Sequence, residues 1–220
     1  MPLVRVLEPE VMDTDEDARA YDSMDHAAVN TAFCDALLSH DPDLAYALDV
    51  GTGTCLLPIE LCRRAPTARI KAIDLSTSML ALGRAHVAQA GLTDVIALAE
   101  VDAKALPEPD ETFSAVLSNS IVHHIPEPMA VLREMVRVLR PGGLLFVRDL
   151  VRPETEASLA SLVATYAAND TAYQRALFDA SLRAALSLEE VRETLRSLQI
   201  PPECARMTSD RHWTLAFRKT

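Results

Sequence analysis

The 220-residue sequence has no apolar run that approaches the ~20 residues needed to span a bilayer. Its opening stretch, MPLVRVLEPE, contains no apolar core of signal-peptide length. We therefore expect neither a membrane span nor a secretory leader.

Cysteines are few, and their spacing is not that of a metal or redox motif. Cys34, Cys55, Cys62 and Cys204 form no C-x-x-C pair and are too sparse for a disulfide scaffold. We expect them to be buried as small apolar residues of a protein in the reducing cytoplasm.

Basic residues do not cluster in this chain. Asp and Glu number 32 against 21 Lys and Arg, which gives a formal net charge of −11. Nucleic acids and anionic membrane surfaces are therefore poor partners on electrostatic grounds, whereas a small substrate stays open. Hydrophobic residues make up 49% of the sequence, enough for one α/β domain with a helical addition.

What the chain does contain is a glycine turn between a short apolar run and a helical pattern. The segment Ala45–Leu61 reads AYALDVGTGTCLLPIEL, in which the apolar run ends at Asp49. Strand, tight turn and helix in this order begin a nucleotide-binding α/β unit. Gly51 and Gly53 allow a sharp turn and a close approach to a ligand. The helix start then offers free N–H groups to an anionic group.

Two positions near the turn limit the ligand. The third glycine of the dinucleotide fingerprint is missing, because Leu56 stands in its place, which argues against a pyrophosphate and a nicotinamide dehydrogenase. Asp74 ends the next apolar run and is placed to hold both hydroxyls of a ribose. A ribose without a pyrophosphate fits S-adenosylmethionine, and Asp49 would add negative charge near its cationic groups.

Five motifs in this order resemble the class I S-adenosylmethionine-dependent methyltransferases, above all the small-molecule branch that includes the quinone-biosynthesis enzymes. They cover roughly residues 45–150 and read LDVGTGT, IDLSTSML, VDAKALPEPDETF, VLSNSIVHHIPEP and LREMVRVLRPGGLLFVRDL. The resemblance implies S-adenosylmethionine as cofactor and S-adenosylhomocysteine as product. It assigns cofactor contacts to Tyr21, Asp49, Gly51, Thr52, Gly53, Asp74, Leu75, Met79, Asp102, Ala103, Asn119 and Ser120. Asp102 would accept a hydrogen bond from the adenine amino group, or else cap a turn.

Alternating strands and helices predict a doubly wound, mostly parallel seven-stranded sheet of the Rossmann-like methyltransferase fold. We expect strands that end at Asp49 and Asp74, and further strands at 95–101, 113–117, 144–148, 204–207 and 212–217. Helices are expected at 26–39, after the glycine turn, from the Ser76 cap to residue 90, at 126–139, twice within 154–185, and from a Ser187 capping box. One domain would comprise an N-terminal arm and helix (1–44), a cofactor-binding core (45–150), a helical lid (151–186) and a closing helix with a hairpin (187–220).

Two of these parts have an alternative interpretation. Residues 1–25 are acidic and irregular, which is typical of a solvated arm, but the resemblance implies a helical arm that folds over the cofactor and brings Tyr21 to it. The helices within 154–185 would cover the substrate as a lid, or only pack on the sheet edge.

Acceptor-side candidates follow the fourth strand, end the fifth and open the last. Transfer to oxygen or nitrogen needs a nearby base, and histidine suits that role near neutral pH. We expect His124, with His123 second, to act with Asp149 and His212 in one pocket. Alternatively His124 only lines the pocket, and His212 only closes the hairpin. These side chains show no metal-ligand spacing, so no metal is expected.

The function predicted is transfer of a methyl group to oxygen, nitrogen or carbon of a small molecule in the cytoplasm. Arg148 and Arg211 hint at a polar or anionic acceptor, although each is more often a surface ion-pair residue. A protein methyltransferase and a non-catalytic S-adenosylmethionine-binding partner protein are the alternatives. The sequence leaves the acceptor and the oligomeric state undetermined.

Overall fold

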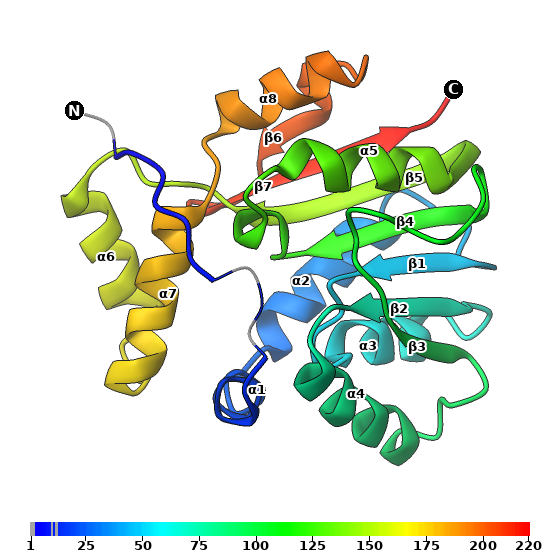
Figure 1. Ribbon diagram of the computed structural model, residues 1–220, viewed down its shortest axis with the longest axis horizontal. Helices are drawn as coiled ribbons and strands as arrows, with labels where there is room; N and C mark the ends of the chain where they lie inside the picture. Colours follow the sequence, from blue (N-terminus) through cyan, green and yellow to red (C-terminus); the bar gives the residue numbers. More distant parts are fainter. Residues whose placement is uncertain (1–2, 10, 12) are drawn as a thin grey trace. The chain divides into compact units, whose positions relative to one another are not determined.

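The computed structural model describes residues 3–9, 11 and 13–220. Its strands form one sheet in the order β3-β2-β1-β4-β5-β7-β6 (Figure 1). The strands are β1 (Ala47–Val50), β2 (Ile70–Asp74), β3 (Ile96–Glu100), β4 (Phe113–Asn119), β5 (Leu139–Leu150), β6 (Ala205–Met207) and β7 (His212–Arg218). The helices are α1 (Asp15–Asp22), α2 (Ala27–Leu38), α3 (Leu56–Arg64), α4 (Thr77–Gln89), α5 (Pro128–Val138), α6 (Glu156–Tyr166), α7 (Ala172–Ala184) and α8 (Leu188–Ser197), with short 3₁₀ turns η1 (Val122–His124) and η2 (Pro202–Cys204).

The sheet is mostly parallel, as the sequence predicts. β1 pairs in parallel with β2 and with β4, and β2 pairs in parallel with β3. β6 and β7 pair antiparallel, with Ala205 opposite Leu215. All four residues of β1 are buried, which is typical of a parallel strand covered on both faces. The carboxyl ends of β1, β2 and β4 therefore meet at one edge, where ligands of such sheets bind.

By internal contacts the described chain divides into two compact units, which alternate along the sequence. The larger unit takes the described residues of Val11–Asn119, together with Ala130–Val147 and Ala216–Thr220. The smaller unit takes those before position 10, Ser120–Met129 and Arg148–Leu215. The single-domain organisation stays a prediction, and each unit is described by itself below.

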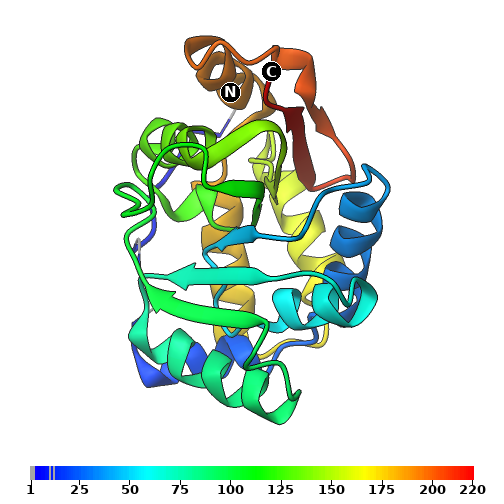
Figure 2. The ribbon, with the colours of Figure 1, turned by 90° about the vertical axis from the view of Figure 1, so that its right-hand side faces the viewer.

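The core of the larger unit lies between helices and sheet. Phe33 and Leu37 of α2 are fully buried, and the Phe33 ring meets Phe146 edge-on at 5.1 Å between centroids. α2 also packs against α3, which follows the glycine turn. Figure 2 shows these two helices close together. The apolar face predicted within residues 26–39 thus packs against the sheet and against α3, the helix that follows the glycine turn.

The smaller unit contains the two helices expected within 154–185, α6 and α7, which pack against each other. Their apolar cluster consists of Leu150, Leu159, Leu182 and Ala185. The Ser187 capping box is confirmed: its hydroxyl accepts the Glu190 N–H, and the Glu190 side chain accepts the Ser187 N–H. Whether α6 and α7 act as a lid stays a prediction.

The structure decides between the two interpretations of residues 15–22, and it corrects one predicted strand boundary. Residues 15–22 are helical, because Thr14 caps the first turn by accepting the Asp17 N–H at 3.0 Å, and acidic residues there complement the helix dipole. β5 begins at Leu139, five residues before its predicted start at Leu144. The Gly142 N–H donates to the Lys219 carbonyl at 2.7 Å, so pairing with the chain end extends the strand through a turn-like sequence.

Candidate functional site

The glycine turn is fixed to the neighbouring strand by its own backbone. The N–H groups of Gly51 and Thr52 both donate to the Ile73 carbonyl at 2.9 Å. Gly51 and Gly53 have φ values of 73° and 55°, in the left-handed region that glycine enters without strain. These residues therefore form a rigid turn at the carboxyl end of β1.

Asp74 joins this turn to α4. Its Oδ2 accepts the Gly53 N–H at 2.7 Å, and its Oδ1 accepts the Ser76 N–H at 2.9 Å. Burial raises the pKa of the Asp74 carboxyl, and the backbone hydrogen bonds partly offset that rise. Each oxygen keeps a second lone pair, so Asp74 can still accept bonds from a ligand.

A pocket opens above the turn within the larger unit. It brings together five of the predicted cofactor residues: Tyr21, Asp49, Gly51, Thr52 and Asn119. The other lining residues are His26, Asn30, Thr54, Leu56 and Leu57, which the sequence analysis did not assign to a site. His26 and Asn30 lie at the start of α2. In the sequence, the only feature that could have indicated a binding role for them is their polar character at the start of an apolar helix.

Three polar side-chain atoms at this pocket are unsatisfied among the described residues, those of Asp49 (Oδ2), Thr52 (Oγ1) and Asn119 (Oδ1). Asp49 Oδ2 and Asn119 Oδ1 are buried and have no hydrogen-bond partner among the described residues. Burial, reinforced by the charge of Asp74, raises the pKa of Asp49 to about 7. Because an unsatisfied buried acceptor costs about 1–3 kcal/mol, both atoms are suited to receive hydrogen bonds from a ligand.

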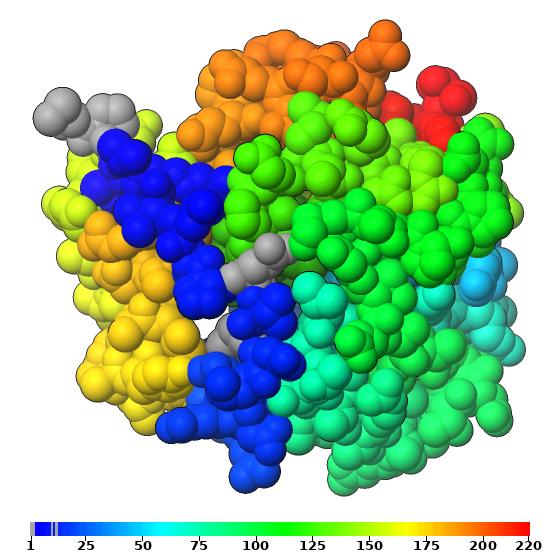
Figure 3. Space-filling view, viewed as in Figure 1, coloured from blue at the N-terminus to red at the C-terminus, as the bar shows by residue number. Residues whose placement is uncertain are grey.

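Tyr21 reaches the pocket from α1. A Cβ built at Gly53 would lie 3.7 Å from Tyr21 Cε1, and the Tyr21 and His26 rings stack with centroids 4.4 Å apart. Burial, then the neighbouring carboxylates, raises the pKa of Tyr21 to about 12. In Figure 3 the arm covers part of the surface beside α4, where Asp13 accepts the Thr77 N–H at 3.1 Å.

The remaining predicted cofactor residues are not among those that line this pocket. Leu75 is partly exposed, whereas Met79 and Ala103 are buried. Ser120 lies in the smaller unit, where its N–H donates to the Arg148 carbonyl. Asp102 caps a turn by accepting the Lys104 N–H at 2.9 Å. Burial opposes ionisation of Asp102, but the hydrogen bonds from Lys104 outweigh it and lower the pKa.

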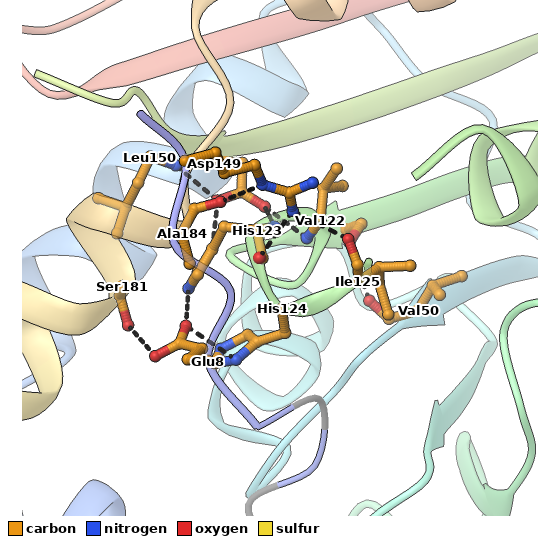
Figure 4. A network of polar contacts seen from close by, with 12 residues as sticks. Glu8, Val50, Val122, His123, His124, Ile125, Asp149, Leu150, Ser181 and Ala184 are labelled. Atoms are coloured by element: carbon orange, nitrogen blue, oxygen red, sulfur yellow. Dashed lines mark hydrogen bonds and ion pairs between the residues drawn. The ribbon is translucent and has the colours of Figure 1, made fainter. Parts of the chain in front are cut away.

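The smaller unit holds a cluster of histidines and carboxylates (Figure 4). Asp149 is almost fully buried, and its Oδ1 lies 2.5 Å from His123 Nδ1. Asp149 also accepts the N–H groups of Val122, His123 and Leu150, which fixes the carboxylate in place. Asp149 thus pairs with His123 rather than with His124, the histidine favoured from the sequence.

His124 and Glu8 form the other half of this cluster. His124 Nδ1 lies 3.1 Å from Glu8 Oε1, and the His123 and His124 rings stack at 4.1 Å. Burial, with the charge of His123 next, lowers the pKa of His124 to about 3, so the ring is neutral at pH 7. Glu8 lies in the N-terminal arm, and no motif indicated it.

His212 occupies the hairpin turn. Its Nδ1 lies 2.9 Å from Ser209 Oγ, which also accepts the His212 N–H at 3.0 Å. Burial, then the charge of Arg148, lowers the pKa of His212 to about 4. Within the described chain, no hydrogen bond or ion pair joins His212 to Asp149 or His124. These contacts favour the hairpin-closing alternative over a shared pocket.

Arg148 is a buried cation. It is 9% exposed, and its Nε has no hydrogen-bond partner among the described residues. Burial, and then the charge of Arg211, lowers the pKa of Arg148. Arg211 itself stacks on the Tyr166 ring at 3.3 Å and pairs with Asp210. Arg148 is therefore a buried residue, and not the surface ion-pair residue that the sequence left as one interpretation.

Comparisons with known proteins agree with this geometry. Residues 48–147 match a family model described as a methyltransferase domain. The phosphatidylethanolamine N-methyltransferase of Cereibacter sphaeroides is 45% identical over 97 residues, 44% of this chain and 46% of that relative. The ubiquinone/menaquinone biosynthesis C-methyltransferase UbiE of Hahella chejuensis is 36% identical over 110 residues, 50% of this chain and 44% of the relative. The chain thus spans about half the length of the curated relatives it matches.

Solved structures extend the likeness of fold over the whole chain. A putative S-adenosyl-L-methionine-dependent methyltransferase from Methanococcus maripaludis aligns with a TM-score of 0.70 at 16% identity, covering 98% of this chain and 97% of that one. The plantazolicin methyltransferase BpumL, in complex with SAH, gives 0.67 at 14% identity and covers 87% and 82%. The [4+2]-cyclase SpnF gives 0.62 at 18% identity and covers 99% and 98%. At such identities the likeness shows the fold alone.

Proposed function

We propose that this chain is a class I S-adenosylmethionine-dependent methyltransferase that transfers a methyl group from S-adenosylmethionine to a small-molecule acceptor, as the match of residues 48–147 to a methyltransferase domain supports. The observation that carries the proposal is the pocket beyond β1 and β4, with the unsatisfied oxygens of Asp49 and Asn119 beside the glycine turn. A ligand with cationic and N–H groups satisfies both oxygens.

The chain's own residues suit the parts of this cofactor. Asp49 would accept a hydrogen bond from the cofactor's ammonium group, which favours the ionised carboxylate and lowers its pKa from about 7. Gly51 and Gly53 allow close approach to the backbone. Asp74 would accept from the ribose hydroxyls while it holds the turn. Tyr21 would cover the ligand from α1, next to Gly53.

The reaction is an in-line displacement at the methyl carbon. The bond from sulfonium sulfur to methyl breaks as the bond from methyl to the acceptor forms, and the sulfonium becomes the thioether of S-adenosylhomocysteine. Holding the three atoms in line can contribute up to ~7–11 kcal/mol in model systems. An oxygen or nitrogen acceptor also loses a proton in this step, which a nearby base would accept.

A small acceptor is supported by the named relatives, a phosphatidylethanolamine N-methyltransferase and a quinone-biosynthesis C-methyltransferase. Arg148 further favours an acceptor with an anionic or strongly polar group, since its buried Nε has no hydrogen-bond partner among the described residues. The net charge of −11 argues against nucleic acid.

The four free cysteines support the proposed location in the cytoplasm. In the described chain, no helix is long and apolar enough to cross a membrane.

The test is incubation with methyl-labelled S-adenosylmethionine and a cell extract split by ultrafiltration into small molecules and proteins. We expect a labelled product in the small-molecule fraction, separated by chromatography from unreacted S-adenosylmethionine, and no such product with the Asp49→Ala variant as control. Label in the protein fraction would indicate a protein methyltransferase. Cofactor binding without any labelled product would indicate a non-catalytic binding protein or other chemistry, which this fold supports in a cyclase.

A further inference from the structure

We propose that Glu8, His123 and His124 form a site for one divalent transition-metal ion such as Zn²⁺. In the described chain these three side chains each offer a ligand atom, and the three atoms lie within 4.8 Å of one another (Figure 4). The site lies in the smaller unit and does not depend on the proposed methyl transfer. The sequence did not predict this site, because the spacing of its residues matches no metal-ligand motif.

The distances fit the coordination sphere of a small cation. Glu8 Oε1 lies 3.6 Å from His123 Nε2 and 3.1 Å from His124 Nδ1. A tetrahedral Zn²⁺ with bonds of about 2.0–2.2 Å needs neighbouring ligand atoms about 3.3–3.5 Å apart. A carboxylate and two imidazoles are ligands that Zn²⁺ accepts. Three protein ligands leave one position open for water or a hydroxyl group, as in catalytic zinc sites.

Asp149 orients the first histidine for this role. Its Oδ1 accepts a hydrogen bond from the His123 Nδ1–H at 2.5 Å. This leaves the lone pair of the ring on Nε2, the nitrogen that faces Glu8. A carboxylate behind a metal-binding histidine is the usual outer-shell partner. Ser181 donates to the other carboxylate oxygen of Glu8 at 3.4 Å, so the ligand oxygen Oε1 stays available.

Two of the three proposed ligand atoms lack a hydrogen-bond partner among the described residues. Neither Glu8 Oε1 nor His124 Nδ1 makes a hydrogen bond of acceptable geometry among the described residues, although both are buried. The formal charge around them also accommodates a cation. Glu8 and Asp149 are acidic, and the nearby Arg5 directs its guanidinium to the carbonyls of Ala184 and Ile125.

The experiment titrates the EDTA-treated 220-residue protein with ZnCl₂ alone by calorimetry, and with CoCl₂ by absorption spectroscopy. We expect one ion per chain and a cobalt spectrum typical of four-coordinate nitrogen and oxygen ligation. Glu8→Gln and His124→Ala should weaken Zn²⁺ binding by at least about 10- to 100-fold, the range known for loss of outer-shell partners alone. Both should also alter the cobalt spectrum.

His40→Ala is the matched control, because His40 is exposed, lies outside the cluster and should leave the affinity unchanged. Unchanged Zn²⁺ affinity in folded Glu8→Gln would overturn the site, as would a wild-type protein that binds no ion. If His124→Ala fails to fold, the near-isosteric Glu8→Gln decides. S-adenosylmethionine binding measured in EDTA tests the proposed function separately, so failure of one proposal leaves the other intact.

Discussion

At the scale of single residues, two carboxylates at neighbouring strand ends have different environments. Asp74 is satisfied by the N–H groups of Gly53 and Ser76, whereas Asp49 keeps an unsatisfied oxygen in a buried position. Asp74 therefore contributes to the structure of the turn even without a ligand. Asp49 costs stability in the free protein, and a cationic ligand would offset that cost.

The pKa of Asp49 gives a prediction about stability and pH. An acid whose pKa rises from 3.8 to about 7 on folding destabilises the protein progressively as pH rises through that interval. At 1.36 kcal/mol per pKa unit the full effect reaches about 4 kcal/mol above pH 7. Asp49→Asn should therefore raise the melting temperature at pH 8, and by less at pH 5, while it weakens cofactor binding.

Thermal melts at the two pH values, with calorimetric titration of S-adenosylmethionine, check this prediction. Asp94→Asn, which removes an exposed carboxylate, serves as control. An Asp49→Asn protein whose melting temperature differs from wild type equally at pH 5 and pH 8 would contradict the assigned pKa.

Asp74→Ala removes a ribose acceptor and a structural acceptor together. Hydrogen bonds to a charged group are worth about 1.5–3 kcal/mol, so cofactor affinity should fall roughly 10- to 150-fold. Because the Gly53 N–H loses its partner, the melting temperature should fall as well. Calorimetry and thermal melts separate the two effects. Unchanged affinity in the folded variant would remove Asp74 from the binding site.

At the scale of elements, α4 presses against the glycine turn through a helical glycine. A Cβ added at Gly83 would lie 2.9 Å from Leu98 Cδ2 and 3.2 Å from Cys55 Cβ. Both contacts are too close for a methyl group, so the glycine permits the helix to pack closely against the segment between Gly53 and α3. Helix α1 of the arm also packs against α4, and it brings Tyr21 close to the glycine turn.

Gly83→Ala should destabilise the protein although alanine favours helix. The propensity gain is about 1 kcal/mol, whereas overpacking costs about 1–3 kcal/mol. We expect a net loss of up to about 2 kcal/mol in the free energy of unfolding, together with weaker cofactor binding. Ala85→Gly, an exposed exchange on the same helix, measures the propensity contribution alone. A more stable Gly83→Ala protein in urea unfolding would show that the helix can move away.

At the scale of the whole molecule, ligand binding should appear as global stability. A ligand that binds the folded state alone adds about 2.7 kcal/mol at a hundredfold excess over its dissociation constant. S-adenosylmethionine and S-adenosylhomocysteine should therefore raise the melting temperature, and NAD should not, because Leu56 replaces the third fingerprint glycine. Scanning calorimetry with each ligand checks this expectation. A shift with NAD alone would contradict the cofactor assignment.

Much of the fold follows from local patterns in the sequence. The run before Asp49, the glycines at 51 and 53 and the run before Asp74 gave strand, turn and strand, because side-chain period and backbone freedom are local properties. The Ser76 and Ser187 caps were predicted for the same reason. β5 was predicted too short, because its extension depends on pairing with Lys219, which no local pattern indicates.

The chemistry-bearing contacts were decided by tertiary structure. The sequence by itself determined that Asp49, Asp74 and the glycine turn meet at one sheet edge, since parallel strands align their carboxyl ends. It did not determine that Asp149 pairs with His123, or that Glu8 joins both histidines. Adjacent histidines point in directions set by the 3₁₀ turn η1, and the arm is positioned by Arg5 bonding to distant carbonyls. Such contacts depend on the packing of segments far apart in the chain, which only the folded structure specifies.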